Sequence, residues 1–341
     1  MTATIPHQYV DRKTDQVRTE QLFADRLVNT IFSDARERPG ALYRALASAR
    51  FSRLLGFLAY DQPMSARLGG TVRFGAALGV DLDECLDPPE TLDTARKVFE
   101  RKIRYWETRP MPADPAAVVS PADAKMVTVS LARAAGAVLK EKFFAFEEML
   151  GGREEWIRAF QGGEAAIFRL TPDKYHFNHT PVAGVVVDHF VVDGDFWPCN
   201  PGAVVALATP FSKNRREVTV IDTDVPGGSG AGLVAMIEVV ALMIGDIVQC
   251  YSAVRYDDPV PVRSGMFLER GRPKSLYRPG SSTDVLIFQK GRIAFDEDLL
   301  ANQRRRDVRT RFAEGFGEPL VETEVTLRTG IGRALPREEN R

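Results

Sequence analysis

The chain has 341 residues, with 45 lysines and arginines against 46 aspartates and glutamates, so its formal net charge is −1. Proteins that bind nucleic-acid backbones concentrate positive charge, so this balance argues against a nucleic-acid partner. Hydrophobic residues make up 44% of the chain and charged residues 27%, which is typical of a folded soluble protein. The three cysteines, Cys85, Cys199 and Cys250, lie far apart, which argues against a disulfide scaffold and a cysteine-built zinc site.

The N-terminal 20 residues are polar and charged and contain no apolar run typical of a signal peptide. We therefore expect a cytoplasmic protein. The most apolar later stretch, residues 234–248, contains Glu238 and Asp246 and is shorter than the roughly 20 residues that span a bilayer. It is expected to form buried strands.

Apolar residues recur at helical spacing over residues 21–61, and a further helix is expected over 92–105. Arg50, Arg53 and Arg67 lie among the apolar residues of the first segment. This pattern fits a helix on an anionic membrane surface, and it also fits a packed helix with a solvated basic face. The basic segment 302–311 allows the same two interpretations.

After a proline-rich break at residues 110–115, the pattern changes to short β-rich runs separated by glycine, proline and aspartate. The runs are residues 127–131, 166–170, 185–192, 217–222, 233–240, 244–250 and 285–289. This spacing favours antiparallel strands over alternating βαβ units. The sequence therefore predicts an α+β protein, in which a helical N-terminal segment precedes an antiparallel, barrel-like β-rich domain.

Two of the four histidines, His176 and His179, lie in one short segment that ends at Pro181. On a turn, which the proline favours, both side chains can line one pocket. A metal site would need a third ligand, and His189 is the other nearby histidine, with no His-Glu-x-x-His helix to hold it. We therefore expect no metal.

A second feature is the segment Pro-Gly-Ser-Ser-Thr at residues 279–283, directly before an apolar run. Its simplest interpretation is a turn that enters a strand. A serine in a strained turn can also attack the preceding carbonyl and form an ester. β-Elimination from this ester cuts the chain and leaves a dehydroalanine, which hydrolyses to a pyruvoyl group. Such a carbonyl is an electrophile that no encoded side chain supplies.

Together the two features resemble the phosphatidylserine decarboxylase family. Its pattern Tyr-His-x-x-His-x-Pro is matched by Tyr175, His176, His179 and Pro181. Further segments resemble family motifs in the same order, at residues 52–59, 80–84, 121–123, 144–151, 199–201, 211–223, 241–247, 295–300 and 321–332. The resemblance covers residues 43–333.

The resemblance implies a self-processing, pyruvoyl-dependent decarboxylase that converts phosphatidylserine to phosphatidylethanolamine and CO2 through a Schiff base. It also implies a homodimer, with peripheral contact to the inner face of the cell membrane. The expected organisation is an N-terminal extension (1–42), a helical, membrane-associated segment (43–110) and a β-rich decarboxylase domain (111–341). Two alternatives stay open: a soluble decarboxylase of a free L-amino acid, and an unprocessed protein of this fold that only binds lipid or another ligand.

The family's catalytic residues carry over to Asp123, His179 and one of the serines Ser281 and Ser282. In this arrangement His179 acts as the base on the serine hydroxyl and Asp123 fixes its tautomer. The resemblance assigns decarboxylation to His176, which would return a proton to the substrate's Cα.

Either serine can be the pyruvoyl precursor. With Ser281 the cut falls between Gly280 and Ser281, and with Ser282 it falls between Ser281 and Ser282. We favour Ser282, because Thr283 then follows it as in the family pattern. The chain departs from that pattern near the site: Pro273 and Ser275 replace a Glu and a Gly, Arg215 replaces a Glu, and Ala124 replaces a Gly. These departures keep a free amino acid open as the substrate.

Overall fold

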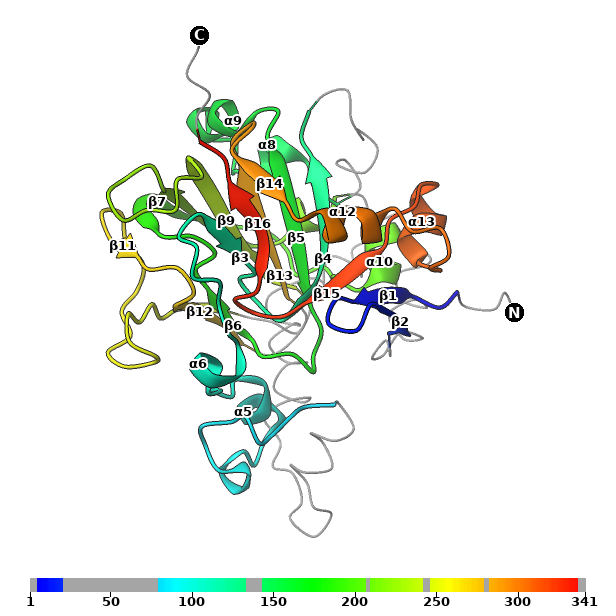
Figure 1. Cartoon of the computed structure of the whole chain (residues 1–341), viewed down its shortest axis with the longest axis horizontal. Helices are drawn as coiled ribbons and strands as arrows, with labels where there is room; N and C mark the ends of the chain where they lie inside the picture. The colour runs from blue at the N-terminus through cyan, green and yellow to red at the C-terminus, as the bar shows by residue number, and fades with distance from the viewer. Residues whose placement is uncertain are drawn as a thin grey trace.

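The computed structural model describes residues 5–20, 79–132, 143–206, 209–241, 246–278 and 282–336. One large sheet, two small sheets and several short helices make up this part of the chain (Figure 1). The helix expected over residues 21–61 lies outside the described residues.

The large sheet has ten strands in an open order. From one edge to the other they are β11 (Phe267–Leu268), β7 (Gly184–Val192), β8 (Arg216–Asp222), β9 (Leu233–Val239), β13 (Ser282–Phe288), β5 (Glu164–Leu170), β4 (Ala124–Ser130), β15 (Glu322–Val325), β1 (Gln8–Asp11) and β2 (Gln16–Thr19). All neighbours are antiparallel except β1 and β15. The predicted antiparallel β-rich part is confirmed, but the barrel-like closure is wrong, because β11 and β2 form two separate edges.

Two small sheets accompany the large one. The first has the order β10 (Ile247–Gln249), β12 (Pro273–Tyr277) and β6 (Phe177–His179), and the second has the order β14 (Ile293–Phe295), β16 (Gly330–Ala334) and β3 (Ala117–Val119). All seven predicted β-rich runs overlap observed strands, with the run at 244–250 giving β10. The first small sheet matters most for function, because β6 follows His176 and ends at His179.

The helices are short. They are α5 (Ala95–Phe99), α6 (Tyr105–Thr108), α8 (Phe146–Met149), α9 (Glu154–Phe160), α10 (Pro201–Ala206), α11 (Pro210–Lys213), α12 (Glu297–Gln303) and α13 (Arg311–Phe316), with a 3-10 turn η3 (Pro89–Thr91). The single helix expected over residues 92–105 is wrong. It is divided into α5 and the start of α6, because Ile103 between them forms an isolated β-bridge with Cys85.

Strand β13 lies in the middle of the large sheet and is buried on both faces. Side chains alternate between the faces of a strand. Leu286 and Phe288 pack on one face in the same cluster as Tyr277, whereas Val285 and Ile287 belong to the cluster on the other face. Ser282 and Asp284 have even numbers and therefore lie on the face that carries Tyr277.

The N-terminal hairpin of β1 and β2 joins the far edge of the large sheet beside β15. Buried ion pairs reinforce this junction. Arg169 Nη2 lies 2.6 Å from carboxylate oxygens of both Glu20 and Glu322, and His7 Nε2 lies 2.7 Å from Glu322 Oε2. Residues 8–19, expected in an N-terminal extension, thus add two strands to the main sheet.

Candidate active site

Short strand β6 holds the two candidate histidines in the interior. His176 directly precedes the strand, His179 ends it, and both side chains are fully buried. The backbone N–H of Tyr277 donates to the carbonyl of His176, which joins β12 to this segment. Helices α5 and α6 lie at the same end of the molecule as β6 and β12 (Figure 1).

The ring of His179 is held at both nitrogens. Nδ1 lies 3.0 Å from the carbonyl oxygen of Gly271, so Nδ1 carries the proton and donates it. Nε2 then accepts a hydrogen bond from the Tyr175 hydroxyl at 3.1 Å. Burial lowers the pKa of His179 to about 3, so the imidazole is neutral at pH 7 and can take a proton at Nε2.

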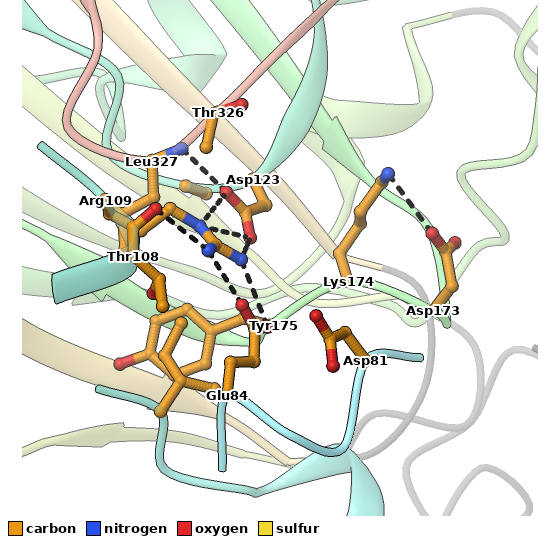
Figure 2. A network of polar contacts seen from close by, with 12 residues as sticks. Asp81, Glu84, Thr108, Arg109, Asp123, Asp173, Lys174, Tyr175, Thr326 and Leu327 are labelled. Carbon is orange, nitrogen blue, oxygen red and sulfur yellow. Dashed lines mark hydrogen bonds and ion pairs between the residues drawn. The ribbon is translucent and has the colours of Figure 1, made fainter. Parts of the chain in front are cut away.

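Asp123, which directly precedes β4, is buried and engaged by other groups. Arg109 Nη2 donates to Asp123 Oδ2 at 2.8 Å, and the backbone N–H of Leu327 donates to Oδ1 at 2.7 Å (Figure 2). Arg109 also pairs with Glu84 at 2.8 Å. Burial alone would raise the pKa of Asp123, but the charge and hydrogen bonds of Arg109 hold it below its ordinary value.

The expected contact between Asp123 and His179 is therefore not made in this structure. The carbonyl of Gly271, and not Asp123, fixes the tautomer of His179, because the guanidinium of Arg109 is a stronger partner for the carboxylate. Asp123 still acts on both histidines at longer range, since its negative charge raises the pKa of each ring against the larger effect of burial.

His176 has a different environment. Its ring stacks on Phe99 of α5 with the centroids 3.5 Å apart. Neither ring nitrogen has a hydrogen-bond partner among the described residues, and burial lowers the pKa of His176 to about 3. A neutral, buried imidazole with both nitrogens unpaired is suited to contact a ligand.

Ser282 is the first residue of β13 and is completely buried. Its Oγ makes no hydrogen bond within the described part of the chain. Residues 279–281 lie outside that part, so Ser281 and both candidate scissile bonds, Gly280–Ser281 and Ser281–Ser282, are not described. Of the two candidate serines, the structure thus places Ser282 only.

Tyr277 connects the histidine segment to the serine strand. Its backbone N–H reaches His176, and its side-chain oxygen Oη lies 2.9 Å from the carbonyl of Thr283 and 2.8 Å from Asp284 Oδ1. The N–H of Val239 on β9 donates to the same Oη. The backbone and the side chain of Tyr277 together therefore tie the His176 segment, β9 and the start of β13 to one another.

Beside Asp123 lies a polar cavity of about 380 Å3. It is lined by both acidic and basic side chains, and Asp81, Lys174 and Tyr175 are visible around Asp123 in Figure 2. Sequence reasoning missed Arg109 and Glu84, which fix Asp123, and it gave Tyr175 no role although that residue is part of the histidine pattern.

A row of carboxyl groups next to Ser282 was also missed. Glu238 on β9 lies opposite Glu217 on β8 and opposite Asp284 on β13, and all three side chains are buried. Lys274 on β12 lies 2.7 Å from Glu238, with both side chains fully buried. The charge of Lys274 keeps the pKa of Glu238 low although burial opposes this. The signal available for Glu238 was a single acidic residue within an otherwise apolar run.

Comparison with known proteins places these features in one family. The family model for phosphatidylserine decarboxylase matches residues 95–318. Phosphatidylserine decarboxylase proenzymes are similar over most of the chain: that of Ruminiclostridium cellulolyticum is 27% identical and covers 97% of this chain and 98% of its own length. The Chlamydia trachomatis protein is 29% identical (91% and 96%), and that of Saccharophagus degradans is 31% identical (78% and 93%). Because the match contains Asp123, the histidine strand and Ser282, the chain belongs to the phosphatidylserine decarboxylase family.

Proposed function

We propose that the chain is a proenzyme that cuts itself at Ser282 and then decarboxylates the serine head group of phosphatidylserine. The observation that carries this proposal is the position of Ser282, buried at the start of β13 and joined through Tyr277 to the segment of His176 and His179. The names of the relatives, all phosphatidylserine decarboxylase proenzymes, support the same substrate and the same self-processing.

In self-processing, the Oγ of Ser282 attacks the carbonyl carbon of residue 281 and its proton passes to a base. The C–N bond breaks, the amine of Ser282 gains a proton, and an ester links the two residues. Loss of the Cα proton of Ser282 and cleavage of its Cβ–Oγ bond then release the carboxylate of residue 281 and leave a dehydroalanine at position 282. Water hydrolyses the dehydroalanine, which releases its nitrogen as ammonia and leaves a pyruvoyl group. The neutral imidazole of His179 is the base we assign, because burial keeps it unprotonated at pH 7.

The environment of Ser282 fits the pyruvoyl group that this reaction would leave. The Oγ of Ser282 and both ring nitrogens of His176 are buried, and among the described residues they have no partners. When present, the pyruvoyl carbonyl supplies an electrophile that condenses with a substrate amine and accepts the electrons released as CO2 departs. His176 is assigned the return of a proton to the substrate's Cα.

Incubation with phosphatidylserine vesicles tests the activity. We expect phosphatidylethanolamine and CO2 in equal amounts, with free L-serine releasing at most traces of CO2. Decarboxylation of free L-serine in preference to the lipid would favour the soluble alternative. A purified protein that stays one uncut chain and releases no CO2 would favour the ligand-binding alternative.

We further propose that the protein works as a homodimer in the cytoplasm, docked peripherally on the anionic inner face of the cell membrane. No helix in the described part of the chain is long and apolar enough to cross a bilayer. Support for docking comes from the basic residues among apolar ones near Phe57 and Leu58, which lie outside the described residues. Changing both to Asp should abolish co-sedimentation with anionic liposomes, and wild-type protein that never co-sediments would refute the docking.

A further inference from the structure

We propose that Asp284 binds the amine of the substrate, by accepting its hydrogen bond on Oδ2 beside residue 282. The inference rests on the self-processing and decarboxylation proposed above and adds a residue that recognises the substrate.

Strand β13 places the side chain of Asp284 close to that of Ser282. Ser282 and Asp284 lie two residues apart on β13, so their side chains share a face of the sheet about 7 Å apart along the strand. On β5, the residues paired with them are the apolar Leu170 and Phe168. Asp284 is therefore the nearest ionisable side chain to Ser282 along this face of its own strand and of β5.

Hydrogen-bond accounting shows which oxygen of Asp284 is available. The Tyr277 hydroxyl accepts the N–H of Val239 and has one hydrogen of its own, yet two oxygens lie within hydrogen-bond distance of it: the carbonyl oxygen of Thr283 at 2.9 Å and Asp284 Oδ1 at 2.8 Å. A proton on Asp284 Oδ1, donated to Tyr277 Oη, lets both short contacts be hydrogen bonds at once. Asp284 Oδ2 remains a bare acceptor, and it has no partner among the described residues although Asp284 is fully buried.

Neighbouring charges agree with a protonated Asp284. Glu238 lies directly opposite on β9, and Lys274 on β12 already pairs with it. A second ionised carboxyl group here would lack a cation of its own among the described residues. Burial first, and then the charge of Glu238, raise the pKa of Asp284 well above its ordinary value, against smaller effects of Tyr277 and Lys274.

The chemistry of the substrate's amine fits a hydrogen-bond acceptor at Asp284 Oδ2. To react at residue 282, an amino-acid head group must bring a neutral amine to that residue, and the amine presents N–H donors. A neutral carboxyl oxygen can orient such an amine by a hydrogen bond. An ionised carboxylate at the same place would instead favour the protonated ammonium form, which has no lone pair with which to react.

The experiment uses methylamine, which offers an amine without carboxylate or phosphate. The self-processed enzyme is mixed with methylamine and cyanoborohydride, and the trapped fraction of the small chain is measured by intact mass against methylamine concentration. Asp284→Val is expected to raise the half-trapping concentration about tenfold, the usual effect of losing one hydrogen bond. Valine suits a buried strand and leaves Tyr277 with its partners Val239 and Thr283, so the variant should fold.

Asp284→Asn distinguishes a neutral acceptor from a charged one. Its amide can donate to Tyr277 and present its oxygen to the amine, so trapping should stay within about twofold of wild type. Glu217→Gln, the same chemical change two strands away in the row, should behave like wild type. Asp284→Ala replaces the valine variant if the latter is not cut.

The outcomes separate this inference from the proposed function. A wild-type protein that is uncut, or cut but not trapped, refutes the proposed function. A wild type that is trapped at the same methylamine concentration as Asp284→Val refutes the role of Asp284. If Asp284→Asn raises the half-trapping concentration of methylamine as much as Asp284→Val does, a charged carboxylate binds the amine, and the proposal is overturned.

Discussion

Replacing Arg109 by leucine should destabilise the protein strongly, because Arg109 is the cation between two buried carboxylates. The side chains of Arg109, Glu84 and Asp123 are only 12%, 9% and 11% exposed. Removing one partner of a buried ion pair leaves an uncompensated charge and costs about 3–5 kcal/mol. We expect a loss of that size in the free energy of unfolding at pH 7.

Urea unfolding of the uncut Ser282→Ala protein, with and without Arg109→Leu, measures this loss. Lys97→Met is the matched control, since Lys97 and Asp93 form an ion pair with side chains 53% and 58% exposed. Such surface pairs contribute at most about 1 kcal/mol.

The pH dependence of the Arg109 effect has a definite sign. The pKa of Asp123 is held below its ordinary value of 3.8 in the folded state, so its pairing stabilises the fold above about pH 4 and this contribution is lost as the pH falls further. The cost of Arg109→Leu should therefore be largest near pH 7 and shrink in acid. A loss below about 1 kcal/mol at pH 7, no larger than that of Lys97→Met, would refute the reasoning.

Three further predictions concern the histidines and the serine strand. His179→Asn should leave the chain uncut on a denaturing gel, whereas His176→Asn should be cut yet release no CO2; two variants with the same defect would contradict the division of roles. Burial holds the pKa of both histidines near 3 in the folded state, so acid should destabilise the uncut Ser282→Ala protein as the pH falls below about 6.5. The free energy of unfolding should fall by up to about 1.4 kcal/mol per pH unit for each histidine. Urea midpoints should show less acid sensitivity when either histidine is asparagine, and unchanged sensitivity would count against neutral burial. The pKa of Asp284 is raised in the folded state, so at pH 7 the folded protein retains a proton that the unfolded chain loses, and this difference lowers stability. Asp284→Asn removes the titrating group and should therefore increase the melting temperature at pH 7. A decrease would contradict the protonated state of Asp284.

The strands of the main sheet could be predicted because their residues are apolar and β-branched. Strands β7, β8 and β9 coincide with runs of this kind. Strand β12 could not, because its Pro273, Lys274 and Ser275 read as a polar turn, and their burial depends on Glu238 from a strand distant in sequence. The open sheet was likewise not predictable, since strand spacing does not determine whether the two edges meet.

The candidate site was predicted as residue types rather than as contacts. His176, His179, Asp123 and Ser282 could be named from the family pattern, and the structure buries all four. The partner of Asp123 could not be named, because Arg109 follows a helix of only four residues and has no motif around it. Asp284 has no separate sequence signal either, and its protonated state is inferred from the contacts of Tyr277 and from the burial of Asp284 opposite Glu238.

Intact-mass measurement of the purified wild type beside Ser282→Ala tests self-processing at Ser282 most directly. Residues 282–341 are 60 of 341, so the 37.8 kDa wild-type chain should appear as fragments of about 31 kDa and about 7 kDa. The smaller fragment should begin with a pyruvoyl group at residue 282 and resist N-terminal sequencing, and Ser282→Ala should remain one chain. An uncut wild type, or a small chain that begins at residue 281, would contradict this assignment.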